Sequence, residues 1–73
     1  MLINREVLMK ILSFHTKEGW LDKARETAKL LAEPDRMAGL NKILAKCVEE
    51  GWFDEARKTA KLLAEPEIIA KIL

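Results

Sequence analysis

The chain has 73 residues, the length of one small domain with a single modest core. Hydrophobic residues make up 49% of it and charged residues 34%, with few glycines and prolines, which indicates a soluble helical protein and argues against a disordered chain. The formal net charge of +1 comes from interspersed signs, so the total charge predicts no strong attraction to nucleic acid or to a membrane.

The sequence also bears on where the protein works. Cys47 is the only cysteine and has no partner for an internal disulfide, which favours a reducing compartment. No apolar run approaches the roughly 18 residues of a membrane span. Arg5 and Glu6 interrupt the N-terminal segment, which has no small-residue cleavage site and does not resemble a secretion signal. We therefore expect a cytoplasmic protein without membrane contact.

The first helix is expected over residues 4–18, because apolar residues recur there at the i, i+3, i+4, i+7 spacing of one helix face. Asn4 suits the N-cap, since its side-chain oxygen can accept from an unpaired amide of the first turn. Gly19 ends the helix, because glycine adopts positive φ without strain. The apolar residues are Val7, Leu8, Ile11, Leu12 and Phe14.

The second helix is expected to begin at about Asp22 and to end at about Ala32, before Pro34 disfavours helical geometry. The connection at residues 19–20 is short, so this helix must run antiparallel to the first. Its predicted inner face consists of Leu21, Ala24, Thr27, Ala28, Leu30 and Leu31. Its predicted solvent face consists of Lys23, Arg25, Glu26 and Lys29.

A third helix is expected over residues 35–50, with Gly51 as its stop, and a fourth from about Asp54 to about Ala64. The apolar face of the third helix is Met37, Leu40, Ile43, Leu44, Cys47 and Val48. Gly39 lies inside it and weakens it by roughly 1 kcal/mol relative to alanine. The simpler interpretation is a tolerated interior glycine, and the alternative is a site where two helices approach closely.

One segment is written twice in the chain. Residues 18–34 (EGWLDKARETAKLLAEP) return 32 residues later as residues 50–66 (EGWFDEARKTAKLLAEP), with 14 of the 17 positions identical. Such a period is the signature of stacked helical hairpins. One difference is an apolar swap, and the other two are charge swaps expected on a solvent-exposed surface. The differing pairs are Leu21/Phe53, Lys23/Glu55 and Glu26/Lys58.

We therefore predict a single all-α domain over residues 1–73, a helical-hairpin repeat array of five helices. Residues 3–34 form the first unit, residues 35–66 the second, and residues 67–73 a partial third unit with one short helix. That last segment is apolar and lacks a following helix to cover it, whereas terminal repeats normally carry a polar outer face. We expect self-association through this segment and the face of the last hairpin, most simply as a two-fold homodimer. Its residues are Ile68, Ile69, Ile72 and Leu73.

The runs at residues 19–24 (GWLDKA) and 51–56 (GWFDEA), with Pro34 and Pro66 closing the units, resemble the tetratricopeptide repeat. The chain departs from that family at its early helical tryptophan, glycine and tyrosine positions, and the unit is about two residues short. The resemblance implies a scaffold that binds proteins or peptides along the concave face of its first helices. The matching candidate positions are Met9, Ser13, Lys17, Asn41, Ala45 and Glu49. Only Asn41 suits the family's carboxylate clamp, which we do not predict.

The chain has one histidine and one cysteine as candidates for catalysis or metal binding. His15 and Cys47 occupy equivalent positions of the two units, which should lie about 8–10 Å apart, beyond hydrogen-bonding reach. We interpret both as packing residues. A metal site needs three or four convergent ligands, and a phosphate-binding loop needs a glycine-rich segment. We therefore predict no enzyme, no metal and no cofactor.

Two other patterns carry alternative functions. Arg25, Lys29, Arg57 and Lys61 would align as a basic stripe that could meet RNA phosphates. Acidic neighbours at pairing distance and few aromatic residues make a salt-bridged surface the better interpretation, so nucleic acid is not expected as a partner.

Trp20 and Trp52 follow the two turn glycines directly. We interpret them as lids over the gap between hairpins, with contact anchors for a partner as the alternative. The sequence thus predicts a non-enzymatic protein-interaction or self-assembly module. An RNA-binding repeat, and a purely structural repeat that is designed or cut from a longer array, remain as alternatives.

Overall fold

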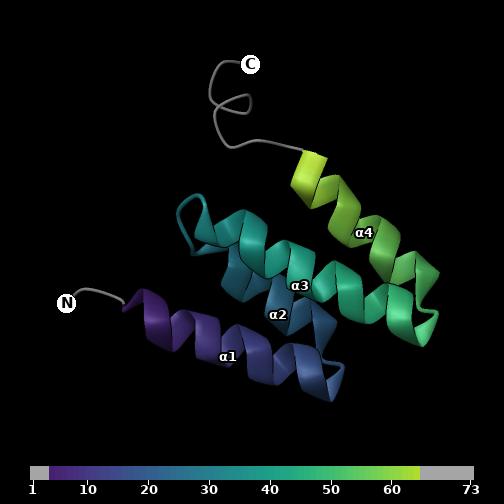
Figure 1. The fold of residues 1–73 in the computed structure, drawn as a ribbon, viewed down its shortest axis with the longest axis horizontal. Helices are drawn as coiled ribbons and strands as arrows, with labels where there is room; N and C mark the ends of the chain where they lie inside the picture. Colours follow the sequence, from purple (N-terminus) through teal and green to yellow (C-terminus); the bar gives the residue numbers. More distant parts are fainter. Residues whose placement is uncertain (1–3, 65–73) are drawn as a thin grey trace.

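The computed structural model describes residues 4–64, which form four α-helices and contain no strand (Figure 1). The all-α class is therefore confirmed for this part of the chain. The predicted fifth helix at residues 67–73, with Ile68, Ile69, Ile72 and Leu73, lies outside the described residues. The four helices are α1 (Arg5–Glu18), α2 (Leu21–Lys29), α3 (Asp35–Glu50) and α4 (Phe53–Ala64).

Helices α1 and α3 end where the sequence predicted. The Asn4 side chain caps α1 by accepting from the Glu6 amide at 2.7 Å. Gly19 and Gly51 end α1 and α3 in the left-handed region, with φ of 81° and 78°. After each glycine, the amide of the following tryptophan donates back to a carbonyl of the last turn at 2.8 Å. This backbone pattern satisfies the last carbonyls and directs the chain into the next helix.

Helix α2 ends three residues earlier than predicted, at Lys29 rather than at Ala32. The Leu30 and Leu31 amides bond to carbonyls only three residues back, so the last turn is tight. Leu31 is 5% exposed, whereas Leu30 is 63% exposed and its prediction as an inner-face residue is wrong. In α4 the same letters stay helical to Ala64, so tertiary packing and not local propensity sets this boundary.

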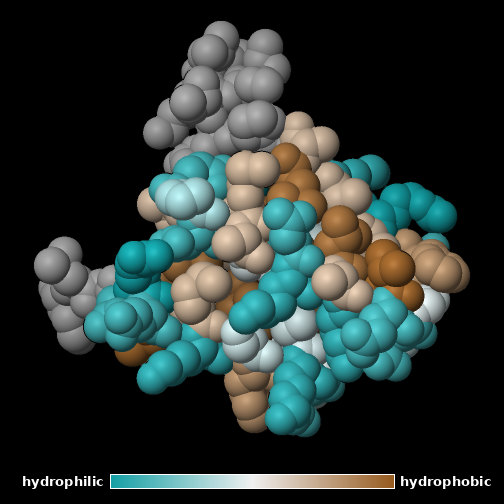
Figure 2. All heavy atoms as spheres, in the orientation of Figure 1, coloured by the Kyte–Doolittle hydropathy of each residue, from teal (hydrophilic) through white to brown (hydrophobic). Residues whose placement is uncertain are grey.

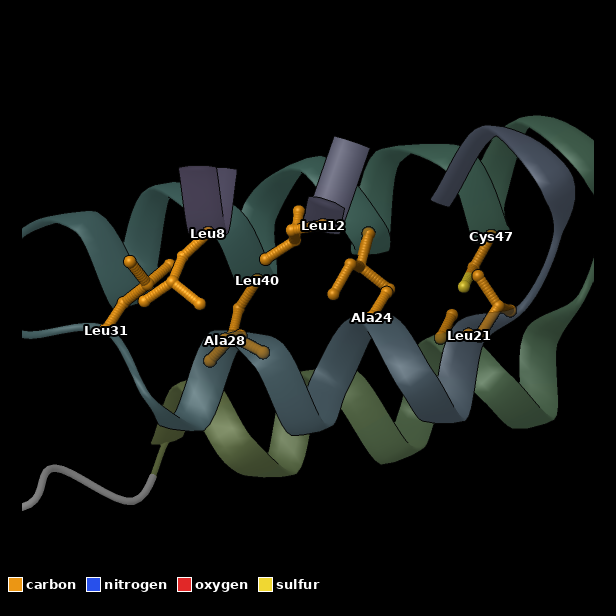
Figure 3. Close-up of a cluster of buried hydrophobic side chains, with 10 residues drawn as sticks. Leu8, Leu12, Leu21, Ala24, Ala28, Leu31, Leu40 and Cys47 are labelled. Atoms are coloured by element: carbon orange, nitrogen blue, oxygen red, sulfur yellow. The ribbon is translucent and has the colours of Figure 1, made fainter. Parts of the chain in front are cut away.

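The helices form two antiparallel hairpins that pack side by side. Helices α1 and α2 pack together, as do α3 and α4, and α3 also contacts both α1 and α2. Helices α1 and α3 lie on one side of the core, and α2 and α4 lie on the other (Figure 3). The buried apolar side chains of all four helices form one cluster: Leu8, Leu12, Leu21, Ala24, Ala28, Leu31, Leu40, Ile43, Cys47 and Ala56.

Gly39 is a close-approach site, so the simpler interpretation of a tolerated glycine is wrong. It is buried where α3 meets α1, and a methyl group built on it would lie 2.7 Å from Leu12 Cδ1. The same methyl group would lie 3.7 Å from Leu31 Cδ1, in ordinary contact. Glycine therefore sets how closely the second hairpin approaches the first.

We predict that Gly39→Ala lowers the free energy of unfolding by about 1 kcal/mol, measured by urea titration of the helical circular dichroism signal. Overpacking against Leu12 costs about 1–3 kcal/mol, and the higher helix propensity of alanine offsets about 1 kcal/mol of that. The control is Ala38→Gly at the neighbouring exposed position, which should lose about 1 kcal/mol through propensity alone. A gain of stability in Gly39→Ala would contradict the close approach.

Candidate interaction surfaces

Arg25 is the residue whose position differs most from the sequence prediction. We expected it on the solvent face of α2, yet only 5% of it is exposed. Its side chain crosses from α2 to α4, where it contacts Glu55 and Thr59. A long aliphatic stem can be buried along its length when the charged head finds polar partners. The prediction that Arg25 faces solvent is therefore wrong.

The Arg25 guanidinium makes three hydrogen bonds, two of which join the two hairpins while the third stays within α2. Nη1 donates to Thr59 Oγ1 at 3.2 Å, and Nη2 donates to Glu55 Oε1 at 2.6 Å and to Asp22 Oδ1 at 2.5 Å. The fully buried Thr59 hydroxyl donates to the Glu55 carbonyl at 3.0 Å, which leaves its oxygen free to accept from Arg25. Bonds of this charge-assisted kind are the strong ones. We name Arg25, Asp22, Glu55 and Thr59 the arginine clamp.

The clamp also sets the protonation of its own members. Burial by itself lowers the pKa of Arg25, but the hydrogen bonds to Glu55 and Asp22 outweigh it and the pKa is raised. The hydrogen bond from Arg25 is the largest cause that lowers the pKa of Glu55, and Lys58 at 3.3 Å acts in the same direction. Both groups therefore stay charged at neutral pH.

Glu55 shows that one of the two charge swaps between the repeats is structural. The equivalent residue of the first unit is Lys23, which is exposed and lies with its Nζ 5.3 Å from the centroid of a Trp20 ring. We expected both residues on a solvent-exposed surface, and this prediction is wrong for Glu55. The sequence held a signal for this contact. Arginine and threonine occur at the same positions of both repeats, as Arg25/Arg57 and Thr27/Thr59, but only the second repeat has an acid, Glu55, one turn before its threonine.

The predicted basic stripe is not formed as a continuous surface. Arg25 is buried in the arginine clamp. Lys29 and Arg57 each pair with an acid on their own helix, at 3.1 Å and 3.4 Å. Lys61 is exposed and borders a shallow groove on α4 with Arg57. These ion pairs within single helices agree with the interpretation of this surface as salt-bridged.

An open groove of about 630 Å³ lies at the turn ends of the two hairpins. It is lined by Gly19, Trp20, Leu21, Asp22, Lys23, Trp52 and Glu55. Trp52 packs between the hairpins, since a methyl group built on Gly19 would lie 3.3 Å from its ring. Trp20 instead packs inside its own hairpin, in edge contact with Phe14 at a centroid separation of 5.6 Å. Trp52 is 38% exposed and Trp20 is 48% exposed, and both remain candidate contact anchors.

His15 and Cys47 lie in different surroundings despite their equivalent positions. Cys47 is fully buried in the core, and burial is the largest cause that raises the pKa of its thiol. The thiol is therefore protonated at neutral pH, the unreactive form. The His15 ring lies 5.6 Å from that of Trp20, and its Nδ1 is buried without a hydrogen-bond partner within residues 4–64.

The candidate residues of the concave face lie on α1 and α3, which are in contact. Ser13 accepts a hydrogen bond from Lys42 Nζ at 2.9 Å, a contact that the sequence did not indicate. Met9 packs partly against the core. The other four candidates are exposed: Lys17, Asn41, Ala45 and Glu49. None of the six lines either of the two grooves described above.

The second hairpin has an exposed surface whose residues sequence analysis did not name as one site. Phe53 is 63% exposed, whereas its twin Leu21 is 5% exposed. Val48 is 57% exposed, whereas its twin Thr16 is 4% exposed. The Arg57 side chain is 73% exposed, against 6% for Arg25. Space also remains above Gly51, where an added methyl group would meet nothing within 4 Å.

The difference between the copies has one cause. The second hairpin covers the first hairpin, and nothing among the described residues covers the second one. We name Val48, Gly51, Phe53 and Arg57 the end surface. Hydrophobic side chains gather along the α3–α4 hairpin on the face shown in Figure 2.

Comparisons with protein-family models, with curated proteins and with solved structures find no match. Within the described residues, no three metal-binding side chains converge. In the same range, no helix is long and apolar enough to span a membrane. The function must therefore be argued from the surfaces themselves.

We predict that Arg25→Ala lowers the free energy of unfolding by about 2 kcal/mol. Removing one partner of a buried ion pair costs about 3–5 kcal/mol, and the exposure of Asp22 and the partial exposure of Glu55 reduce that loss. The matched control is Arg57→Ala at the equivalent exposed position, which should change stability by less than about 0.5 kcal/mol. Equal losses in the two variants, measured by urea unfolding, would contradict a buried clamp.

A second prediction concerns acid stability. Because the folded pKa of Glu55 lies below its ordinary value of 4.5, its contribution to stability is present above that pH and is lost as the pH falls through the folded pKa. Urea unfolding in a series of buffers below pH 4.5 should show a shallower loss of stability in Glu55→Gln than in the unchanged protein. Glu26→Gln, which changes an exposed carboxylate of α2, serves as the control and should retain the steeper loss. Identical pH profiles for Glu55→Gln and the unchanged protein would contradict this role of the clamp.

Proposed function

We propose that this chain is a non-enzymatic protein-interaction module and that the end surface of its second hairpin is the binding site. The observation that carries the proposal is the contrast between twin positions, above all 63% exposure at Phe53 against 5% at Leu21. The first hairpin has a leucine and an arginine buried at two of these positions, and the second hairpin exposes a phenylalanine and an arginine at the equivalent ones.

The composition of the end surface supports this assignment. The exposed Phe53 ring and the exposed Val48 side chain both give apolar contact area, and monomeric proteins rarely expose large apolar areas without use. Arg57 supplies a planar donor group at the edge, and arginine and aromatic residues are enriched among residues that dominate binding energy. The partner of this surface is a protein, and a second copy of the chain is the simplest one.

RNA binding is the weaker alternative. The burial of Arg25 removes one of the four cations on which that function depends. Lys29 and Arg57 carry acids beside them, which weaken the attraction of phosphates.

We predict that the protein forms a dimer at hundreds of micromolar and that Phe53→Lys abolishes it, because a charge would replace the apolar centre of the contact. The measurement is sedimentation equilibrium at concentrations tenfold apart. Phe14→Lys, which alters an aromatic residue on α1 that is 54% exposed, is the control and should leave the dimer intact. A monomer at every concentration, or a dimer unaffected by Phe53→Lys, would contradict the proposal.

A further inference from the structure

The contact between the two hairpins indicates which kind of partner could bind the end surface, because the second hairpin repeats residues that the first one uses in that contact. The residues of the second hairpin that contact the first one include Gly39, Trp52, Glu55 and Thr59. Asp35 and Lys42 add exposed hydrogen bonds to the first hairpin. Gly39 allows close approach to Leu12, Trp52 covers Gly19, and Glu55 with Thr59 receives Arg25. These contacts define a recognition pattern on an incoming helical hairpin.

The second hairpin repeats the receiving half of that pattern, 32 residues later in the sequence. Leu44 is the twin of Leu12, Gly51 of Gly19, and Arg57 of Arg25. Leu44 is only partly buried, Gly51 has open space above it, and Arg57 is exposed. The second hairpin therefore carries equivalents of the leucine, the turn glycine and the arginine through which the first hairpin is contacted.

To bind the second hairpin of another copy, the first hairpin would need the residues that the second hairpin uses in the known contact. It differs from them at two positions. Val7 stands where the second hairpin has Gly39, and Lys23 stands where it has Glu55. A side chain at the first position meets Leu12 Cδ1 at 2.7 Å in the known contact, so Val7 would clash with Leu44 of another copy. Lys23 would face Arg57 of that copy, and like charges in direct opposition are unfavourable.

The other two positions of the first hairpin do match. Trp20 is the twin of Trp52, and Thr27 is the twin of Thr59. The Thr27 hydroxyl donates to the Lys23 carbonyl at 3.1 Å, as the Thr59 hydroxyl donates to the Glu55 carbonyl at 3.0 Å. An oxygen is thus oriented to receive an arginine in both copies. Among these four positions, only the bulk at residue 7 and the charge at residue 23 fail to match the pattern.

We propose that the end surface recognises a helical hairpin with glycine on its first helix, tryptophan after its turn glycine, and glutamate and threonine one turn apart on its second helix. Val7 and Lys23 exclude the chain's own first hairpin from this role, so copies do not stack head to tail. This inference rests on the proposed function of the end surface. It adds the chemistry of a partner other than a second copy, and it predicts that copies of the chain do not form head-to-tail filaments.

The test is to convert the first hairpin into the partner. The variant V7G/K23E should stack head to tail, and because such contacts do not close, its mass should grow beyond a dimer with rising concentration. Sedimentation at concentrations tenfold apart measures this growth. The triple variant V7G/K23E/R57A should weaken the association at least about tenfold, since it removes one partner of the new ion pair. The single variants V7G and K23E should each associate less than the double variant.

The outcomes separate this inference from the proposed function. If V7G/K23E keeps the mass of the unchanged protein, or if R57A has no effect on its growth, the recognition pattern is wrong. Growth of the unchanged protein beyond a dimer would also overturn it, because Val7 and Lys23 would then exclude nothing. The proposed function is decided separately, by the Phe53→Lys comparison in the unchanged background.

Discussion

The Arg25 guanidinium is the polar link on which the packing of the two hairpins depends. Two other polar links between the hairpins, Arg5 to Asp35 at 2.7 Å and Lys42 to Ser13 at 2.9 Å, lie at exposed positions. The buried remainder of the contact is apolar and non-directional, so it resists separation but does not by itself fix how far one hairpin slides along the other. Arg25 bonds to a carboxylate and a hydroxyl on α4 and to a carboxylate on its own helix. This geometry permits one relative position of α2 and α4. Gly39 and Trp52 then fix the approach distance on α1 and at the hairpin turn.

The same contact explains why two nearly identical repeats have different roles. The first hairpin has its leucine, its arginine and its turn glycine covered, and the second presents the equivalent phenylalanine, arginine and glycine to solvent. Sequence identity between the copies therefore makes the covered surface a guide to the exposed one. The differences at residues 7 and 23 then become informative, because they lie where a second copy would have to fit.

Much of the fold follows from the sequence, because local signals act there. Apolar periodicity and the turn glycines correctly predict the helices, and Asn4 is the cap that it was expected to be. The early end of α2 could not be predicted, since the same letters continue the helix in α4 and only the tertiary setting differs. Arg25 was misplaced for a similar reason. Helical periodicity assigns a face, and burial at the edge of that face depends on Glu55 and Thr59, which lie a full repeat away.

The most direct test of this account is a double-mutant cycle between Arg25 and Glu55. The free energy of unfolding would be measured for the unchanged protein, Arg25→Ala, Glu55→Gln and the variant that carries both changes. A link between the hairpins predicts a coupling energy of about 1–2 kcal/mol, so that the two losses overlap instead of adding. Losses that add to within about 0.3 kcal/mol would contradict it, because Arg25 and Glu55 would then not act on each other across the two hairpins.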